Sequence, residues 1–204
     1  WSTEVGADAA EGTSVNVPVL PGTGDRLWLR AFHAVVPGAV AAFKPQIIIS
    51  QCGVDSHRED PLADLGLTVD GQRAAFRAMR DLADQVCEGR WIAVGGGGYG
   101  LIRVVPRAWT HLIAAVLDRD LDPRTSLPDE WRDKVRLAAP SIDLPSTMSD
   151  DGDVDYPPWD GPGGSPESGV EHVDRAVHRI DTAIVATRRA VYPLWGLDPE
   201  DPRD

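Results

Sequence analysis

A chain of 204 residues, 42% of them hydrophobic and 25% charged, is long enough to bury a core of its own. Its formal net charge of −12 argues against a nucleic-acid partner, because affinity for nucleic acids comes mainly from neutralising phosphates. No apolar run is long enough to cross a membrane and no signal peptide is evident, so we expect a cytoplasmic protein without a membrane partner.

The first part of the chain predicts a strand followed by a helix. Valines alternate with polar or turn residues over residues 14–20, which is typical of a strand. A Pro-Gly turn follows, and Asp25 is placed to cap a helix whose apolar residues recur three and four positions apart. Pro37 is expected to kink or split this helix, and Lys44 with the proline after it ends the helix.

Two short apolar runs, at residues 46–50 and 91–94, predict buried strands. Asp55 follows the first run and Tyr99 follows the second, within a run of glycines. Ligands of open parallel sheets bind at the carboxyl ends of the strands. A carboxylate and a phenol at the ends of two such strands are therefore a candidate active site.

Helices are predicted around these strands. The helix between them begins at a cap formed by Thr68 or Asp70, and another follows the second strand over residues 105–117. The apolar residues of this later helix, which we expect to pack against the sheet, are Trp109, Leu112, Ile113 and Val116. Alternating strands and helices predict an α/β fold with a parallel sheet.

The remainder of the chain predicts a loop and a final helix that belong to the same domain. Residues 1–144 form its main part and include a short helix over residues 128–137. Residues 145–169 are rich in Pro, Gly, Ser and Asp, which predicts an exposed or disordered loop with a solvated acidic run. Residues 170–204 contain an amphipathic helix expected to pack back on the domain. Its apolar stripe is Val173, Val177, Ile180 and Ile184.

Two other patterns compete for a functional interpretation. Residues 95–100, GGGGYG, satisfy the dinucleotide-binding pattern, and Asp118 and Asp120 lie about twenty residues on. Turn and loop residues follow the predicted helix, however, and a bulky Tyr99 would crowd a pyrophosphate. His57, two positions after Asp55, could join it on a metal ion, although a surface loop histidine is the better interpretation.

The motifs SQCGVDS and DPL, then a helix, then VGGGGYG followed by RAW, resemble the C-terminal half of the zinc-dependent histone deacetylase family. The segments VNVPVLPGTGD, LADLGLTVDGQ and AVYPLWGLDP resemble in particular its bacterial branch, the acetoin utilization deacetylases. The resemblance implies a three-layer α/β/α sandwich of the arginase/deacetylase type, present here only as its C-terminal part. The two cysteines, Cys52 and Cys87, are expected to be buried apolar residues.

The resemblance also assigns roles. Asp55 would be a ligand of zinc, or of iron in its place, and Tyr99 would bind the acetyl carbonyl and then the oxyanion. Leu62 would line the tunnel for the acyl-lysine side chain, and the glycines of residues 95–98 would let the Tyr99 loop pass close to the metal. The implied reaction is removal of an acetyl group from a lysine of a protein or from a small acetylated amine.

The sequence departs from the family pattern in one respect. The family takes two further metal ligands and a proton-transfer histidine pair from its N-terminal half, and none of these has a counterpart here. One hypothesis is therefore a metal-dependent deacetylase, and the alternative is that the chain alone is an inactive fragment or interaction module. Its partner would be the missing N-terminal half, without which we expect an apolar face of the sheet to be exposed.

Overall fold

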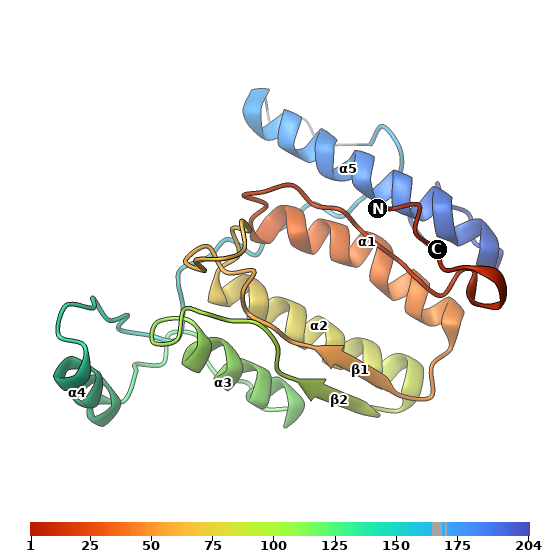
Figure 1. Cartoon of the computed structure of the whole chain (residues 1–204). Coiled ribbons are helices and arrows are strands. Elements are labelled where there is room, and N and C mark those ends of the chain that lie inside the picture. Colours follow the sequence, from red (N-terminus) through yellow and green to blue (C-terminus); the bar gives the residue numbers. More distant parts are fainter. Residues whose placement is uncertain (165–168, 170) are drawn as a thin grey trace.

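The computed structural model describes residues 1–164, 169 and 171–204, and the side chains of His172 and Val173 lie outside this description. The elements, labelled in Figure 1, are η1 (Asp8–Ala10), α1 (Asp25–Phe43), β1 (Ile48–Gln51), α2 (Val69–Cys87), β2 (Trp91–Val94), α3 (Val105–Val116), α4 (Asp129–Ala138), α5 (Glu171–Val191) and η2 (Tyr192–Trp195). None of the described helices is both long and apolar enough to cross a membrane.

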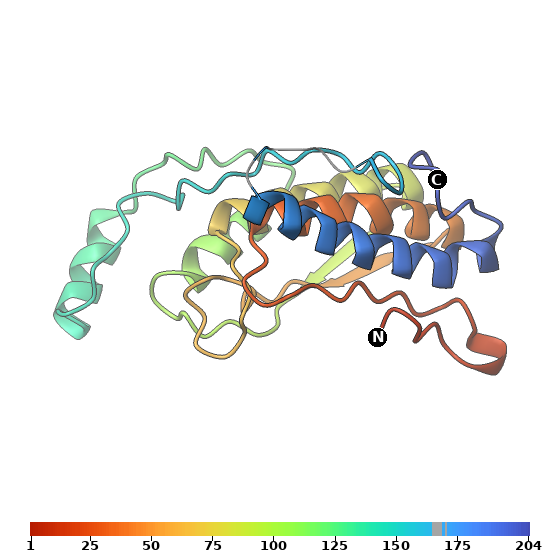
Figure 2. The ribbon, with the colours of Figure 1, turned by 90° about the horizontal axis from the view of Figure 1, so that it is seen from above.

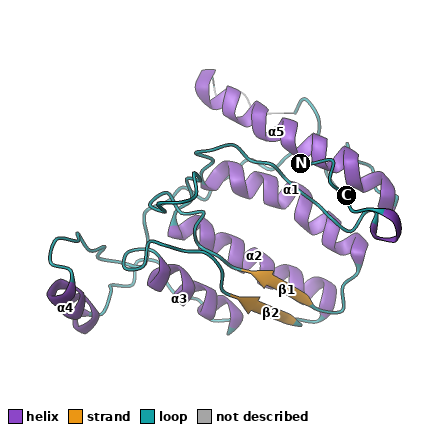
Figure 3. Cartoon of the chain, viewed as in Figure 1, coloured by secondary structure: helices purple, strands orange, loops and turns teal. Residues whose placement is uncertain are grey.

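The sheet of the described residues consists of two parallel strands, β1 and β2, connected through α2 (Figure 3). Ile48 pairs with Trp91 at one end of the ladder and Gln51 with Val94 at the other. The polar ends of both strands therefore meet at the same edge, where parallel sheets bind their ligands. The α/β class and the parallel sheet predicted from the sequence are confirmed.

The strand predicted over residues 14–20 is wrong. This segment is irregular, and no strand of the described chain pairs with it. Its alternating valines, Val15, Val17 and Val19, pack instead against a cluster contributed by α1, α5 and Trp159. The alternation reflects one buried side of the segment, but here helices rather than a neighbouring strand provide the apolar partner.

Helices α2 and α3 cover one face of the sheet. The core beneath them includes Cys52, Phe76 and Leu112, and Trp109 packs against it. Cys87 is also buried. Of the residues expected to pack against the sheet, Ile113 and Val116 do not: they are 59% and 37% exposed, because they lie on the side of α3 turned away from this core.

The opposite face of the sheet is bare, so the prediction of fully buried strands is wrong. Burial alternates along both strands, and Ile49 is 65% and Ile92 47% exposed. Ile47 and Val94 are exposed beside them. Such a contiguous group of large apolar side chains is what an uncovered face of a sheet leaves in water. The exposed apolar face expected for this chain is confirmed.

Helix α1 is continuous through Pro37 rather than split, and it ends at Lys44 in a left-handed conformation. It packs between α2 and α5, and this packing offsets the hydrogen bond that Pro37 cannot donate. Asp25 is not its cap, which is Gly24. Instead the buried Asp25 carboxylate accepts hydrogen bonds from Thr68 N (2.8 Å) and Thr68 Oγ1 (2.6 Å), and burial raises its pKa.

The prediction that the C-terminal helix packs on the domain is confirmed. Val177, Ile180 and Ile184 of α5 are buried, whereas the side chain of Val173 lies outside the described residues. A buried ion pair joins α1 to α5, with Arg30 Nε 2.7 Å from Asp181 Oδ1. Thus α5 forms an additional helical layer on α1, on the side away from α2 (Figure 1).

After α3 the chain forms a helix, α4, that stands apart, and the segment that follows α4 packs back against the rest of the molecule. Figure 2 shows α4 standing apart from the other helices, in agreement with its having no buried residue. Met148, Asp150 and Trp159 in the following segment are instead buried, so the prediction of an exposed loop is wrong for these residues. Two apolar side chains and a paired carboxylate attach this segment to the body of the molecule.

Candidate active site

The loops that leave the two strands stay together beyond the sheet. Cys52 N donates a hydrogen bond to Val94 O (2.8 Å), and Val54 N donates to Gly97 O (2.6 Å). Trp109 of α3 supports the same loop through a hydrogen bond from Nε1 to Cys52 O (3.0 Å). The loop that carries Asp55 is thereby held beside the glycine run.

Asp55 lies against that glycine run. A β-carbon at Gly97 would collide with the Asp55 carboxylate, and one at Gly96 would collide with the side chain of Gln51. Gly98 has a φ of +155° and would bring a β-carbon 2.6 Å from Val54 Cγ2. Glycine is therefore required here because the backbone approaches the carboxylate too closely for any side chain.

Tyr99 follows directly and is 49% exposed at the same edge. Its backbone N–H donates a hydrogen bond to Asp60 Oδ2 (3.0 Å). The other oxygen of Asp60 accepts hydrogen bonds from Leu62 N (2.9 Å) and Ala63 N (3.2 Å). One carboxylate thus ties the Tyr99 loop to the Leu62 turn, and the Leu62 side chain itself is 71% exposed.

Sequence reasoning missed this role of Asp60. The residue belongs to the DPL motif, but its partner, Tyr99 N, is 39 residues further along the chain. The available signal was an Asp placed just before a Pro, a pair that commonly accepts hydrogen bonds from the backbone of its own turn. That signal predicts the bonds from Leu62 and Ala63 and does not predict the bond from Tyr99.

His57 is buried, so its interpretation as a surface histidine is wrong. Its Nε2 lies 2.8 Å from Asp150 Oδ2, and its Nδ1 accepts a hydrogen bond from Glu59 N (3.1 Å). The ring therefore carries its proton on Nε2, and this N–H donates a hydrogen bond to Asp150 Oδ2. With both nitrogens engaged, His57 does not share a metal ion with Asp55 in this arrangement.

Asp150 is the centre of a buried polar network that sequence reasoning missed. Besides His57, its carboxylate contacts Arg107 Nη2 (2.7 Å) and accepts a hydrogen bond from Val69 N (3.0 Å). Burial by itself would raise its pKa, but the hydrogen bonds from His57 and Val69 and the charge of Arg107 outweigh burial. The pKa of Asp150 is therefore well below its ordinary value. The acidic run from Asp150 onward is solvated only beyond this first residue.

A metal ion, which the family resemblance implies, fits this chain only in part. Asp55 offers one carboxylate at the edge where the loops meet. Within the described part of the chain, however, no group of three or more His, Cys, Asp or Glu side chains is placed to hold a metal ion. Structural and catalytic zinc sites use three or four protein ligands, so these residues by themselves do not form one.

The dinucleotide-binding interpretation is not supported. Asp118 and Asp120 follow α3 directly and lie on no strand of the described chain. Asp120 instead pairs with two arginines of α2, Arg73 (2.6 Å) and Arg77 (2.9 Å). An acidic residue held this way is not at a strand end, where it would bind a ribose.

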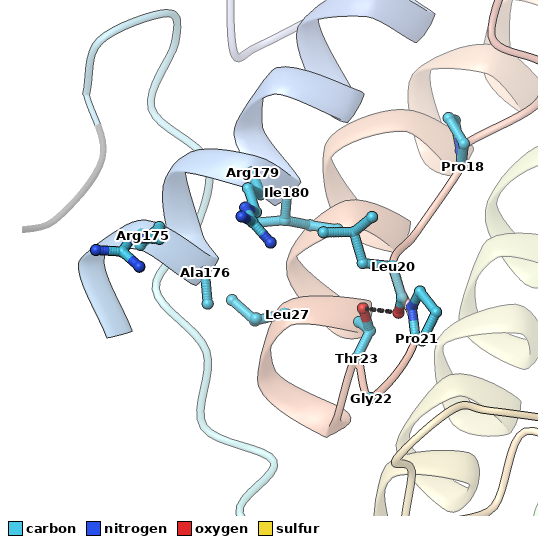
Figure 4. A pocket seen from close by; sticks show the side chains of 10 residues that line it. All are labelled: Pro18, Leu20, Pro21, Gly22, Thr23, Leu27, Arg175, Ala176, Arg179 and Ile180. Carbon is cyan, nitrogen blue, oxygen red and sulfur yellow. Dashed lines mark hydrogen bonds between the residues drawn. The ribbon is translucent and has the colours of Figure 1, made fainter. Parts of the chain in front are cut away.

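A pocket elsewhere in the molecule is separate from these residues. It has a volume of about 210 Å³ and lies between α5 and the segment that leads into α1 (Figure 4). Figure 4 shows apolar side chains such as Leu27 and Ile180 within it, and Arg175 and Arg179 on α5 beside it. None of Asp55, Leu62 or Tyr99 lines it, so it is no part of the candidate active site.

Comparisons with known proteins give one consistent family. Residues 1–116 match the model of the histone deacetylase domain. The acetoin utilization protein AcuC of Bacillus subtilis is 38% identical over 177 residues, which cover 87% of this chain and 45% of that protein. AcuC of Staphylococcus xylosus is 40% identical over 149 residues, covering 73% and 38%.

A solved structure agrees with these matches. The crystal structure of the HDA15 HD domain superposes with a TM-score of 0.52 at 32% identity, covering 58% of this chain and 32% of that one. The chain spans less than half the length of the two AcuC relatives it matches. By the domain match and by these relatives, the chain belongs to the histone deacetylase family.

Proposed function

We propose that this chain is part of a metal-dependent deacetylase that removes acetyl groups from an acetylated lysine or a small acetylated amine. The observation that carries the proposal is the contact between the Asp55 carboxylate and Gly97, two residues before Tyr99. This contact holds together the loops that follow the two strands, which supports a site in which the Asp55 carboxylate and the Tyr99 phenol act at one edge of the sheet. The two AcuC relatives are acetoin utilization proteins by name, which supports a part in acetoin utilization.

Each residue of the site has a proposed role. Asp55 is one ligand of a zinc ion, with iron as the other candidate, and the bound metal would supply a Lewis acid. The Tyr99 hydroxyl donates a hydrogen bond to the carbonyl oxygen of the acetyl group and holds it as negative charge develops there. Leu62, exposed beside the site, lines the approach of the acyl-lysine side chain.

A second proposal concerns the chain by itself, which we propose is inactive. The observation favouring it is that the described residues supply one carboxylate and no complete ligand group. The bare apolar face of the sheet supports an N-terminal half of the same domain as the missing partner. In the cell we propose a cytoplasmic location for the assembled protein.

Metal content and turnover on a fluorogenic acetyl-lysine peptide test both proposals. The chain is assayed alone and after co-expression with the N-terminal half of the Bacillus subtilis relative. We expect stoichiometric zinc and turnover only from the assembled protein. Turnover by the chain alone would contradict the second proposal, and the absence of turnover from an assembled, metal-loaded protein would contradict the first.

Variants of the assembled protein test the individual roles. Tyr99→Phe should lower turnover about a hundredfold or more and leave the metal bound, because one oxyanion donor is lost. Asp55→Asn should lose the metal. The matched control is Tyr156→Phe, which removes the same hydroxyl from a tyrosine that stacks on His33 of α1, outside the site. An equal loss in both tyrosine variants would contradict the role of Tyr99.

A further inference from the structure

Asp150 lies beyond residues 1–116, the part of the chain that matches the family model, yet it contacts the loop that carries the proposed metal ligand. It reaches His57 from a position 93 residues further along the chain. Its side chain is 6% exposed, and that of His57 is fully buried. This segment therefore belongs to the surroundings of the candidate site, although it contributes no atom to it.

Asp150 is itself rigidly held. Its backbone N–H donates a hydrogen bond to Asp70 Oδ2 (2.8 Å), and Arg107 Nη1 donates to the carbonyl of Ser149 (2.9 Å). Next to them, His111 Nε2 lies 3.0 Å from the carbonyl of Met148. Helices α2 and α3 thus fix the backbone on which the Asp150 carboxylate stands. A carboxylate supported in this way can define the position of a neighbouring loop.

The backbone of His57 connects Asp150 to the loop that carries Asp55. Its backbone N–H donates to Val54 O (3.2 Å), and its carbonyl accepts from Asp60 N (2.9 Å). The first of these bonds closes the turn that contains Asp55, and the second closes the turn that leads from His57 to Asp60. Asp60 in turn holds the backbone of Tyr99, so both proposed functional residues are connected to the one imidazole.

We propose that Asp150 is a positioning residue for the candidate site, which fixes the Asp55 loop through its hydrogen bond with His57. The proposal rests on the proposed function for its purpose but not for its geometry. Residues that orient a metal ligand without touching the metal commonly change affinity or activity by about ten- to a hundredfold when mutated. Asp150 is placed to act on both loops of the site in this way.

The first experiment measures backbone amide hydrogen exchange in the 204-residue chain carrying Asp150→Asn. We expect the amides of residues 57–60 to exchange about tenfold faster than in the unmodified chain, with little change in α1 and α5. Asp151→Asn is the matched control: the neighbouring side chain is exposed, and the substitution removes the same charge. Unchanged exchange at residues 57–60, or an equal increase in every helix, would overturn the proposal.

Two further variants separate the His57 contact from the support that Asp150 gives to α2. Thr68→Ala removes the helix cap, whose hydroxyl accepts from Gly71 N (3.2 Å) and donates to Asp25 Oδ2 (2.6 Å), and leaves the hydrogen bond between His57 and Asp150 in place. If it loosens residues 57–60 as much as Asp150→Asn does, the effect passes through α2 and the proposal fails. If Asp150→Asn does not fold, His57→Gln decides the matter, since it must loosen residues 57, 58 and 60 with Asp150 in place. Glu59 is not counted, because its N–H loses its own acceptor, His57 Nδ1.

Kinetics of the assembled enzyme complete the test. Asp150→Asn should lower kcat about tenfold and leave KM within about twofold, whereas Asp151→Asn should change neither. If Asp150→Asn loosens the loop but the unmodified assembly shows no turnover, the proposed function alone is contradicted. If the unmodified assembly turns over but the loop of Asp150→Asn exchanges as before, the positioning role alone is contradicted.

Discussion

The two faces of the small sheet differ completely in their surroundings. On one face, α2 and α3 bury an apolar core that includes Phe76, Ala108 and Leu112. On the other, Ile49 and Ile92 are exposed to solvent. The candidate site lies at the edge of the sheet, between the covered face and the bare face. The loops that carry Asp55 and Tyr99 are therefore supported by packing on one side of the sheet only.

The buried polar network around Asp150 also lies on the covered side of the molecule. Asp150, His57 and Arg107 are buried on the side of the loops where α2 and α3 begin. The described residues form no comparable layer over the bare strands. What this chain contributes to the candidate site should thus depend on the covered face.

The largest effect is expected in the covered face. Phe76→Ala should lower the free energy of unfolding by about 3–5 kcal/mol, or abolish the cooperative transition, because a buried aromatic is replaced by a cavity. Phe43→Ala makes the same change at a side chain that is 61% exposed and should cost less than about 1 kcal/mol. Denaturant unfolding measures both, and similar losses would erase the contrast between buried and exposed positions.

An intermediate effect is expected at the edge between the faces. Gly97→Ala should lower the free energy of unfolding by about 1–3 kcal/mol, because the new methyl group displaces the Asp55 carboxylate. Gly95→Ala is the control, since its β-carbon would lie 3.4 Å from the Trp109 ring, an ordinary contact. Thermal unfolding compares the two variants. If both are equally stable, the Asp55 carboxylate is free to move and the edge is less constrained than the structure indicates.

A smaller effect is expected from pH. The Asp150 pKa is lower in the folded than in the unfolded protein, so the unfolded state binds a proton more readily as the pH falls. The stabilisation from Asp150 is thus complete above its ordinary pKa of 3.8 and decreases below it. As the pH falls from about 4 to 2, the free energy of unfolding of Asp150→Asn should therefore decrease less steeply than that of the unmodified chain. Parallel pH curves of unfolding free energy would show that the carboxylate is not paired as observed.

The smallest effect on stability is expected in the bare face. The double variant Ile49→Thr, Ile92→Thr should change the free energy of unfolding by no more than about 0.5 kcal/mol while reducing self-association, because both side chains face solvent. Ile113→Thr changes an isoleucine that is 59% exposed on α3 and should leave association unchanged. Sedimentation velocity distinguishes these outcomes. Equal self-association of both variants would mean that the chains do not associate through the bare face of the sheet.

Much of the fold and site could be predicted because the signals are local. The cap at Thr68, the start of α3 at Val105 and the stop at Lys44 depend on a few neighbouring residues, and each is observed. Asp55 and Tyr99 follow parallel strands, whose carboxyl ends must share an edge. Their proximity to each other therefore followed from topology alone.

Other features depend on partners distant in the chain. The alternating pattern of residues 14–20 indicates one buried side but cannot distinguish a neighbouring strand from the helices that lie there. His57 looked like a surface histidine among charged neighbours, and Asp150 like one more carboxylate in an acidic loop. Only the meeting of segments 93 residues apart makes them a buried pair.

The sequence by itself thus determined the α/β class, the order of the helices and the two residues at the sheet edge. Periodicity and caps are encoded within a few residues, and a parallel crossover leaves little choice of arrangement. The tertiary structure decided which face of the sheet is covered and which carboxylate holds the Asp55 loop. Burial and pairing are properties of segments that meet only after folding, so no local pattern reports them.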